Sequence, residues 1–140
     1  MRRAVRAAAA GATAAAVWVA VEPVWRRAFR GPHRELRLVG RMLAPEAAWK
    51  PVGLAVHLMN GAMFGIAFDR LGGRGVRQAV IAAQAENAVL WPTMLIVDRL
   101  HPDVRSGDWP PLARNPRVAA QEVASHTVFG VVLGTLLADD

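Results

Sequence analysis

The feature that most restricts the fold of this chain is a run of eighteen residues, 51–68, without a single formal charge. Residues 7–21 are also uncharged, and residues 78–97 and 118–138 each contain only one carboxylate. A helix that crosses a membrane needs about 20 apolar residues, with a lower limit near 17. The sequence therefore predicts an all-α protein, a bundle of four transmembrane helices at about 5–25, 51–69, 76–98 and 117–138.

The competing fold is a soluble four-helix bundle, in which every helix needs a charged outer stripe. No charged residue lies between Lys50 and Asp69, and none lies between Glu122 and Asp139. Two such faces are difficult to hydrate. We therefore expect one integral membrane domain over residues 1–140, with short connections that leave both termini on the same side.

The first apolar run follows a basic start, MRRAVR, and this order also suits a secretory signal peptide. Ala14 and Ala16 would then form the cleavage pair. The run continues beyond them to Val24, and it has a counterpart later in the chain. These two features favour a retained first transmembrane helix.

The connection after the first run is the most cationic part of the chain, with seven Lys and Arg residues against two carboxylates between residues 26 and 50. Within it, residues 32–43 have the pattern of a short amphipathic helix with apolar residues on one side. Such a helix lies in the headgroup layer and attracts anionic lipids, although an ordinary solvated connector fits as well. The basic side of this predicted interfacial helix consists of Arg34, Arg37 and Arg41.

Two of the apolar runs carry the same stripe, a histidine followed at four-residue steps by two glycines. Residues four apart share a helix face, and small residues on such a face let two helix backbones approach closely in lipid. The two copies are 69 residues apart, and the same shift places Pro23 on Pro92. We therefore expect an internal repeat of two two-helix units, 5–70 and 76–138, with the second and fourth helices packed centrally on each other. The stripes are His57, Gly61 and Gly65, and His126, Gly130 and Gly134.

Ionisable and amide side chains inside these runs are costly in a bilayer and therefore suggest a functional site. One interpretation is a buried cluster that relays protons, holds an anion or binds a divalent metal, and paired histidines also suit haem. The other interpretation is neutral histidines that form hydrogen bonds between helices. We assign no metal and no cofactor on this basis. The predicted cluster is His57, Asn60, Glu86, Asn87, Glu122 and His126.

The composition excludes several classes of function. There is no cysteine, so disulfides, thiolate metal sites and cysteine nucleophiles are excluded. The net charge of +6 rests on sixteen Arg and one Lys, which stand at the ends of the apolar runs, where membrane anchoring accounts for them better than base stacking on a folded face. We therefore expect no nucleic-acid binding, and in the absence of a nucleophile elbow, phosphate loop or zincin motif we expect no enzyme.

The distribution of basic residues gives a prediction of orientation. With four spans, the two connections 26–50 and 98–117 share one side and hold eleven Lys and Arg residues, against six on the other side. Basic connections remain in the cytoplasm. Both termini are thus predicted to face outward.

Four short motifs resemble YagU-like bacterial inner-membrane proteins, a family of uncharacterised function. They are WVAVEP at 18–23, the segment 57–65, Trp91-Pro92, and EVASHTVFG at 122–130. The resemblance implies an inner-membrane location, and the link of one such protein to acid resistance hints at proton handling. This chain is shorter and its cationic first connection has no clear counterpart in that family, so the resemblance implies no activity.

We therefore expect an accessory or structural component of the bacterial inner membrane, with the lipid bilayer and its anionic lipids as partners. A second copy or another membrane protein would bind through the glycine faces. The alternative function is a small proton- or ion-handling membrane protein that uses the polar cluster.

Overall fold

The computed structural model describes residues 2–138 and contains helices and connections, with no strand in that range. Four helical segments are long, and two short helices lie at one end. In chain order the elements are α1 (Arg2–Phe29), α2 (Glu35–Leu43), α3 (Trp49–Arg70), α4 (Gly75–Leu90), the 3₁₀ turn η1 (Trp91–Thr93), α5 (Met94–Leu100), α6 (Pro102–Arg105) and α7 (Pro116–Leu136).

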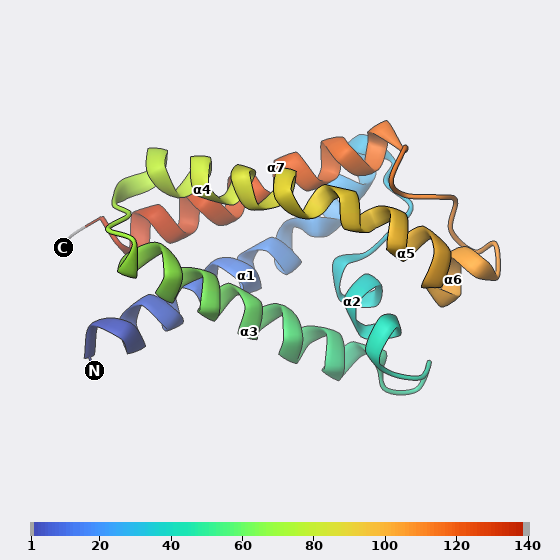
Figure 1. The fold of residues 1–140 in the computed structure, drawn as a ribbon, viewed down its shortest axis with the longest axis horizontal. Coiled ribbons are helices and arrows are strands. Elements are labelled where there is room, and N and C mark those ends of the chain that lie inside the picture. The colour runs from blue at the N-terminus through green and yellow to red at the C-terminus, as the bar shows by residue number, and fades with distance from the viewer. Residues whose placement is uncertain (1, 139–140) are drawn as a thin grey trace.

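The long helices lie alongside one another, and α4, η1 and α5 form one nearly continuous rod (Figure 1). Pro92 lies in η1, where its missing N–H and fixed ring disturb the helical hydrogen-bond pattern and tighten it into a 3₁₀ turn. Both ends of the chain and the turn between α3 and α4 lie at one end of the molecule. The short helices α2 and α6 lie at the opposite end.

Glycines set the contacts within two pairs of long helices. The stripe of α3 faces α1, and a Cβ added at Gly61 would lie 2.6 Å from the carbonyl oxygen of Gly11. The stripe of α7 faces α4, and a Cβ added at Gly130 would lie 2.6 Å from the Cα of Val80. Our prediction that the second and fourth helices pack on each other through these stripes is therefore wrong. Each glycine stripe instead receives the preceding long helix, and α1 and α7 join the two pairs.

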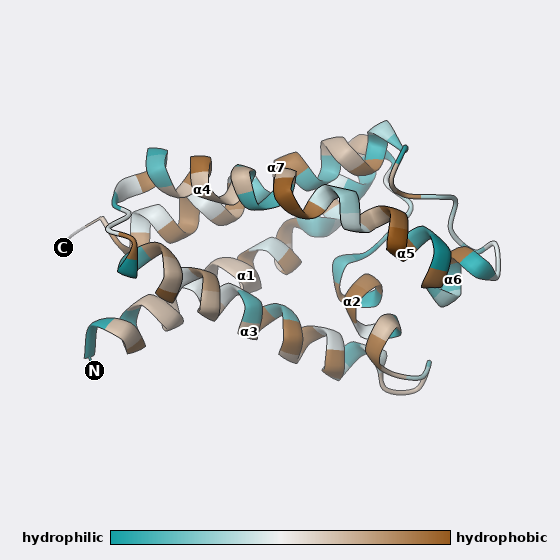
Figure 2. Ribbon diagram, in the orientation of Figure 1, coloured by the Kyte–Doolittle hydropathy of each residue, from teal (hydrophilic) through white to brown (hydrophobic). Residues whose placement is uncertain are grey.

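Three segments are long and apolar enough to cross a membrane, namely Arg2–Phe29, Trp49–Arg70 and Gly75–Leu100. Helix α7, predicted as the fourth span, is not one of them, because polar residues occupy its first half. Many large apolar side chains on the outer faces are exposed, and Figure 2 shows brown bands along the long helices. The polar residues in the first half of α7 include Arg117, Gln121, Glu122 and His126. The described part of the chain is thus all-helical, and its three long apolar helices suit a membrane protein.

The larger apolar core lies between α1, α3, α4 and α7, and a smaller one at the other end contains Leu38 of α2. Alanines of α1 and α4 in the larger core allow the helices to approach, and the rings of Trp18, Phe68 and Phe129 fill the remaining space. Phe64 packs edge-on against Phe129 with ring centroids 5.2 Å apart. This half of the bundle is therefore tightly closed.

Helix α2 does not present all of the arginines expected of an interfacial helix. Arg34 is exposed, whereas Arg37 and Arg41 are half-buried and form ion pairs with Asp103 and Glu46. Helix α2 packs on the beginning of α3, where Gly40 and Gly53 allow backbone contact. The helix is therefore fixed to the bundle.

Candidate functional site: a histidine and glutamate cluster beside a cleft

A cleft of about 390 Å³ lies between α3 on one side and α4, η1 and α5 on the other. Helices α1 and α7 contribute Trp18, Glu122 and His126 to its lining, and α2 lines it at one end. The walls near α2 and α5 are apolar. All six residues of the predicted polar cluster line this one cleft: His57, Asn60, Glu86, Asn87, Glu122 and His126.

The two histidines of the glycine stripes are buried in the protein and contact the same side chain. Both pack edge-on against the indole of Trp18, with ring centroids 5.3 Å away for His57 and 4.5 Å away for His126. Both are 7% exposed. Trp18 is therefore the shared contact of the two imidazoles, since helix α1 lies against both α3 and α7.

Helix carbonyls fix the tautomers of these two histidines. His57 Nε2 donates to the carbonyl oxygen of Ala15 at 3.2 Å, and His126 Nδ1 donates to the carbonyl oxygen of Glu122 at 2.8 Å. A carbonyl only accepts, so the hydrogen in each contact belongs to the imidazole. In the neutral ring the opposite nitrogen, Nδ1 of His57 or Nε2 of His126, then keeps its lone pair.

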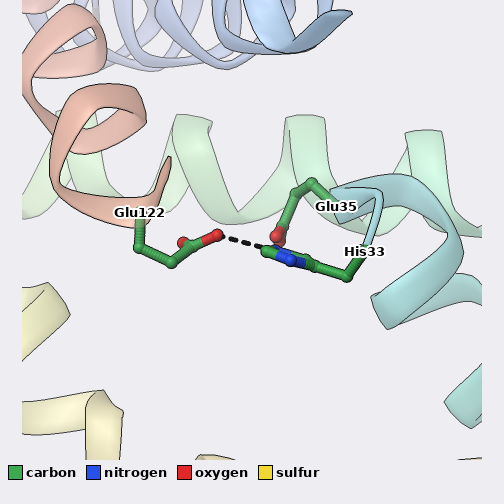
Figure 3. Close-up of side chains that lie close together, drawn as sticks. All are labelled: His33, Glu35 and Glu122. Carbon is green, nitrogen blue, oxygen red and sulfur yellow. Dashed lines mark hydrogen bonds and ion pairs between the residues drawn. The ribbon is translucent and has the colours of Figure 1, made fainter. Parts of the chain in front are cut away.

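Two further titratable residues reach the site from the connection between α1 and α2. His33 is fully buried, and its Nε2 lies 2.8 Å from Glu122 Oε1 (Figure 3). Glu35, the first residue of α2, lies with one carboxylate oxygen 3.7 Å from His57 Nδ1. Glu122 therefore lies between two histidines, since its other oxygen is 3.8 Å from His126 Nδ1.

The backbone before α2 is shaped to bring these side chains in. Arg30 has a φ of 55°, which turns the chain sharply after α1. Gly31 then passes so close to the side-chain amide of Gln121 that a Cβ at this position would overlap it. Glu22, on the last part of α1, accepts the backbone N–H of Glu35 at 2.7 Å and so caps α2.

Charge pairing opposes the effect of burial on the two residues of the connection. Burial alone lowers the pKa of His33, but the hydrogen bond and charge of Glu122 raise it above the ordinary value. Burial alone raises the pKa of Glu35, but the hydrogen bond and charge of His57 lower it below the ordinary value. The pairs therefore favour the ionised forms of both side chains.

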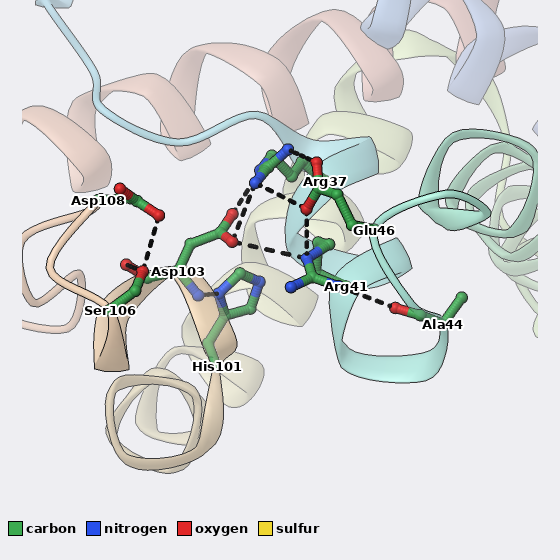
Figure 4. A network of polar contacts seen from close by, with 8 residues as sticks. All are labelled: Arg37, Arg41, Ala44, Glu46, His101, Asp103, Ser106 and Asp108. Carbon is green, nitrogen blue, oxygen red and sulfur yellow. Dashed lines mark hydrogen bonds and ion pairs between the residues drawn. The ribbon is translucent and has the colours of Figure 1, made fainter.

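A second polar network holds α2 over the end of the cleft (Figure 4). Arg37 donates to both carboxylate oxygens of Asp103, which is the second residue of α6, and also to Glu46. Arg41 adds an ion pair to Glu46 at 3.1 Å. Burial alone raises the pKa of Asp103, but Arg37 lowers it overall. The network thus ties the first half of the chain to the second.

The predicted cluster contained only polar residues of the long helices. It missed His33 and Glu35, which lie outside those helices, and it missed Trp18 of α1, which is apolar. Glu35 had one signal, because it is one of only two carboxylates in a strongly cationic segment. The predicted residues differ in depth: Asn60 is exposed and Glu86 and Asn87 are half-buried, whereas Glu122 is 4% exposed.

Comparison with models of known protein families, with curated proteins and with solved structures gives no match for this chain. The resemblance to YagU-like proteins therefore remains a prediction from the motifs alone.

Proposed function

We propose that this chain is a multi-pass protein of the bacterial inner membrane with an accessory or structural role. The observation that carries the proposal is the exposure of the segment Gly75–Leu100. Only 6% of its most apolar stretch of 18 residues is buried inside the protein. In water, each large aliphatic side chain left exposed forgoes about 1.5–3 kcal/mol relative to burial. Hydrocarbon around this rod removes that cost.

Helix α7 completes a four-helix transmembrane bundle in this proposal. It packs along α4 and against α1, two of the segments that suit a bilayer. Its polar residues Gln121, Glu122, Ser125 and His126 are buried in the bundle, which is where polar groups of membrane helices belong. Two helix pairs, each closed by a glycine stripe, also fit the proposed repeat with its offset of 69 residues.

The natural absence of cysteine makes the topology directly testable. Leu71→Cys places one thiol at the turn between α3 and α4, and Arg105→Cys places one near α6, at the other end of the molecule. A membrane-impermeant maleimide should label the two from opposite sides of inner-membrane vesicles, with Arg105 on the cytoplasmic side. Labelling of both from one side, or a protein that remains monodisperse without detergent, would refute the proposal.

A second candidate function is proton or ion handling by the buried cluster. It is supported by the convergence of His33, His57 and His126 on the carboxylates of Glu35 and Glu122. Proteoliposomes with a pH-sensitive dye inside test it. Wild-type protein should show a pH-dependent flux that His57→Gln/His126→Gln abolishes, while His101→Gln, a buried histidine outside the cluster, retains it. No flux from correctly inserted wild-type protein would count against this candidate.

A further inference from the structure

One group in the cluster has the composition and spacing of a metal site. His33, Glu35 and Glu122 each offer one ligand atom, and these three atoms lie within 4.8 Å of one another. A metal ion bound at about 2.0–2.2 Å to imidazole nitrogen and carboxylate oxygen separates neighbouring ligand atoms by about 3.3–3.6 Å in tetrahedral geometry. Small side-chain movements that open the His33–Glu122 contact and draw in Glu35 therefore produce the required triangle (Figure 3).

Charge also favours a divalent ion at this position. Glu35 and Glu122 place two carboxylates in a largely buried environment, where charge without compensation is costly. A divalent cation bound to a neutral imidazole and two carboxylates brings the group to zero. The exposed fractions of the His33 and Glu122 side chains are 0% and 5%.

His33 has few polar contacts. Its ring is fully buried, Nε2 has Glu122 as its hydrogen-bond partner, and Nδ1 has no hydrogen-bond partner among the described residues. The indole of Trp109 lies edge-on to the ring, with the ring centroids 6.2 Å apart. A metal ion on Nε2 would replace the hydrogen bond to Glu122 with a stronger bond to the ring.

The donor set indicates the class of ion. Imidazole nitrogen with carboxylate oxygen suits Zn²⁺, Mn²⁺ or Fe²⁺, whereas Ca²⁺ and Mg²⁺ prefer oxygen alone and Cu⁺ prefers sulfur. Glu35 and Glu122 line the cleft, so further coordination positions open toward it. His57 Nδ1, which keeps its lone pair in the neutral ring, lies 3.7 Å from Glu35 and is placed as a fourth ligand.

We propose that His33, Glu35 and Glu122 form a binding site for one divalent transition-metal ion, open to the cleft between α3 and α4. This proposal rests on the second candidate function, ion handling by the buried cluster, and names the class of ion. It does not depend on the number of membrane spans.

The test is a titration of the untagged full-length protein in detergent with Co²⁺, a coloured substitute for Zn²⁺, followed by its visible absorption and by competition with Zn²⁺. The wild type should bind one ion per chain. His33→Gln and Glu122→Gln should each weaken binding by more than about tenfold, since even residues that only support ligands contribute 10- to 100-fold. Glu86→Gln, a carboxylate on the same cleft outside the triad, should bind as the wild type does.

Absence of Co²⁺ and Zn²⁺ binding by folded wild-type protein would overturn the proposal, and so would equal affinity in the wild type and both ligand variants. Helical circular dichroism establishes folding, and if the two buried variants do not fold, Glu35→Gln takes their place because its side chain is 14% exposed. Maleimide labelling of Leu71→Cys and Arg105→Cys in inner-membrane vesicles, introduced into the wild type and into each ligand variant, tests membrane insertion separately. A loss of metal binding with normal labelling therefore separates failure of this site from failure of the membrane proposal.

Discussion

The glycine stripe of α7 leads to a prediction about stability. The direction of the change shows whether Gly130 has a packing role. Gly130→Ala improves the intrinsic helix propensity by about 1 kcal/mol, so a glycine without a packing role would become more stable on substitution. In the structure, the new Cβ would lie 2.6 Å from the Cα of Val80, 2.8 Å from its nitrogen and 2.9 Å from the carbonyl oxygen of Ala79. All three are backbone atoms of α4, and no side-chain rotation relieves the overlap.

The magnitude follows from the shortfall of about 0.8 Å against the 3.4 Å at which ordinary contact begins. Helices α4 and α7 must separate by most of this distance, and a gap of 0.5–1 Å forfeits a quarter to a half of each dispersion contact. Overpacking of this kind costs about 1–3 kcal/mol. Because the overlapping atoms all belong to backbone, the cost falls in the upper part of that range, about 2–3 kcal/mol. Subtracting the propensity gain of about 1 kcal/mol, we expect Gly130→Ala to lower the free energy of unfolding by about 1–2 kcal/mol.

Reversible unfolding in mild detergent, followed by helical circular dichroism, measures this loss. Ala85→Leu, which adds a larger side chain at an exposed position of α4, is the matched control and should leave stability unchanged. Gly61→Ala disturbs the other interface, between α1 and α3, and its cost should add to that of Gly130→Ala because the two sites share no partner. A Gly130→Ala variant as stable as the wild type, or more stable, would refute the account of helix packing.

Three more predictions concern the polar groups. Glu122→Ala removes the buried partner of His33 and should lower the free energy of unfolding by about 3 kcal/mol, with part of the loss recovered in Glu122→Ala/His33→Ala, as a double-mutant cycle in detergent would show. Asp103→Asn breaks its pair with Arg37 and should raise hydrogen exchange in α2, whereas Asp108→Asn at an exposed position should not; equal exchange in both variants would count against the network as the anchor of α2. The folded-state pKa of Asp103 lies below its ordinary value of 3.8. The stabilisation of α2 by the Asp103–Arg37 pair is therefore complete above pH 3.8 and is lost as the pH falls through the folded-state pKa. Loss of hydrogen-exchange protection in α2 already at pH 5 would contradict the lowered pKa of Asp103.

The long helices and their polar residues were predictable because both depend on local patterns. Runs of eighteen to twenty-one residues with at most one charged residue predict helices, and the six polar residues within them all line one cleft. The partner of each glycine stripe was not predictable from the stripe. A surface of small residues accepts any helix, and in the structure α3 packs on α1 and α7 packs on α4, a choice that the stripes themselves do not encode.

The cationic connection shows where pattern reasoning is incomplete. Its arginines suggested a helix that lies on lipid headgroups, yet Arg37 and Arg41, four residues apart on one face of α2, are neutralised by Asp103 and Glu46. A different face, with Glu35, Leu38, Val39 and Met42 at helical spacing, lines the cleft. Three of those four residues are apolar, as packing requires. The carboxylate that breaks the apolar pattern lies beside His33 and Glu122, and a residue that violates local rules at such a place is where a functional site is to be expected.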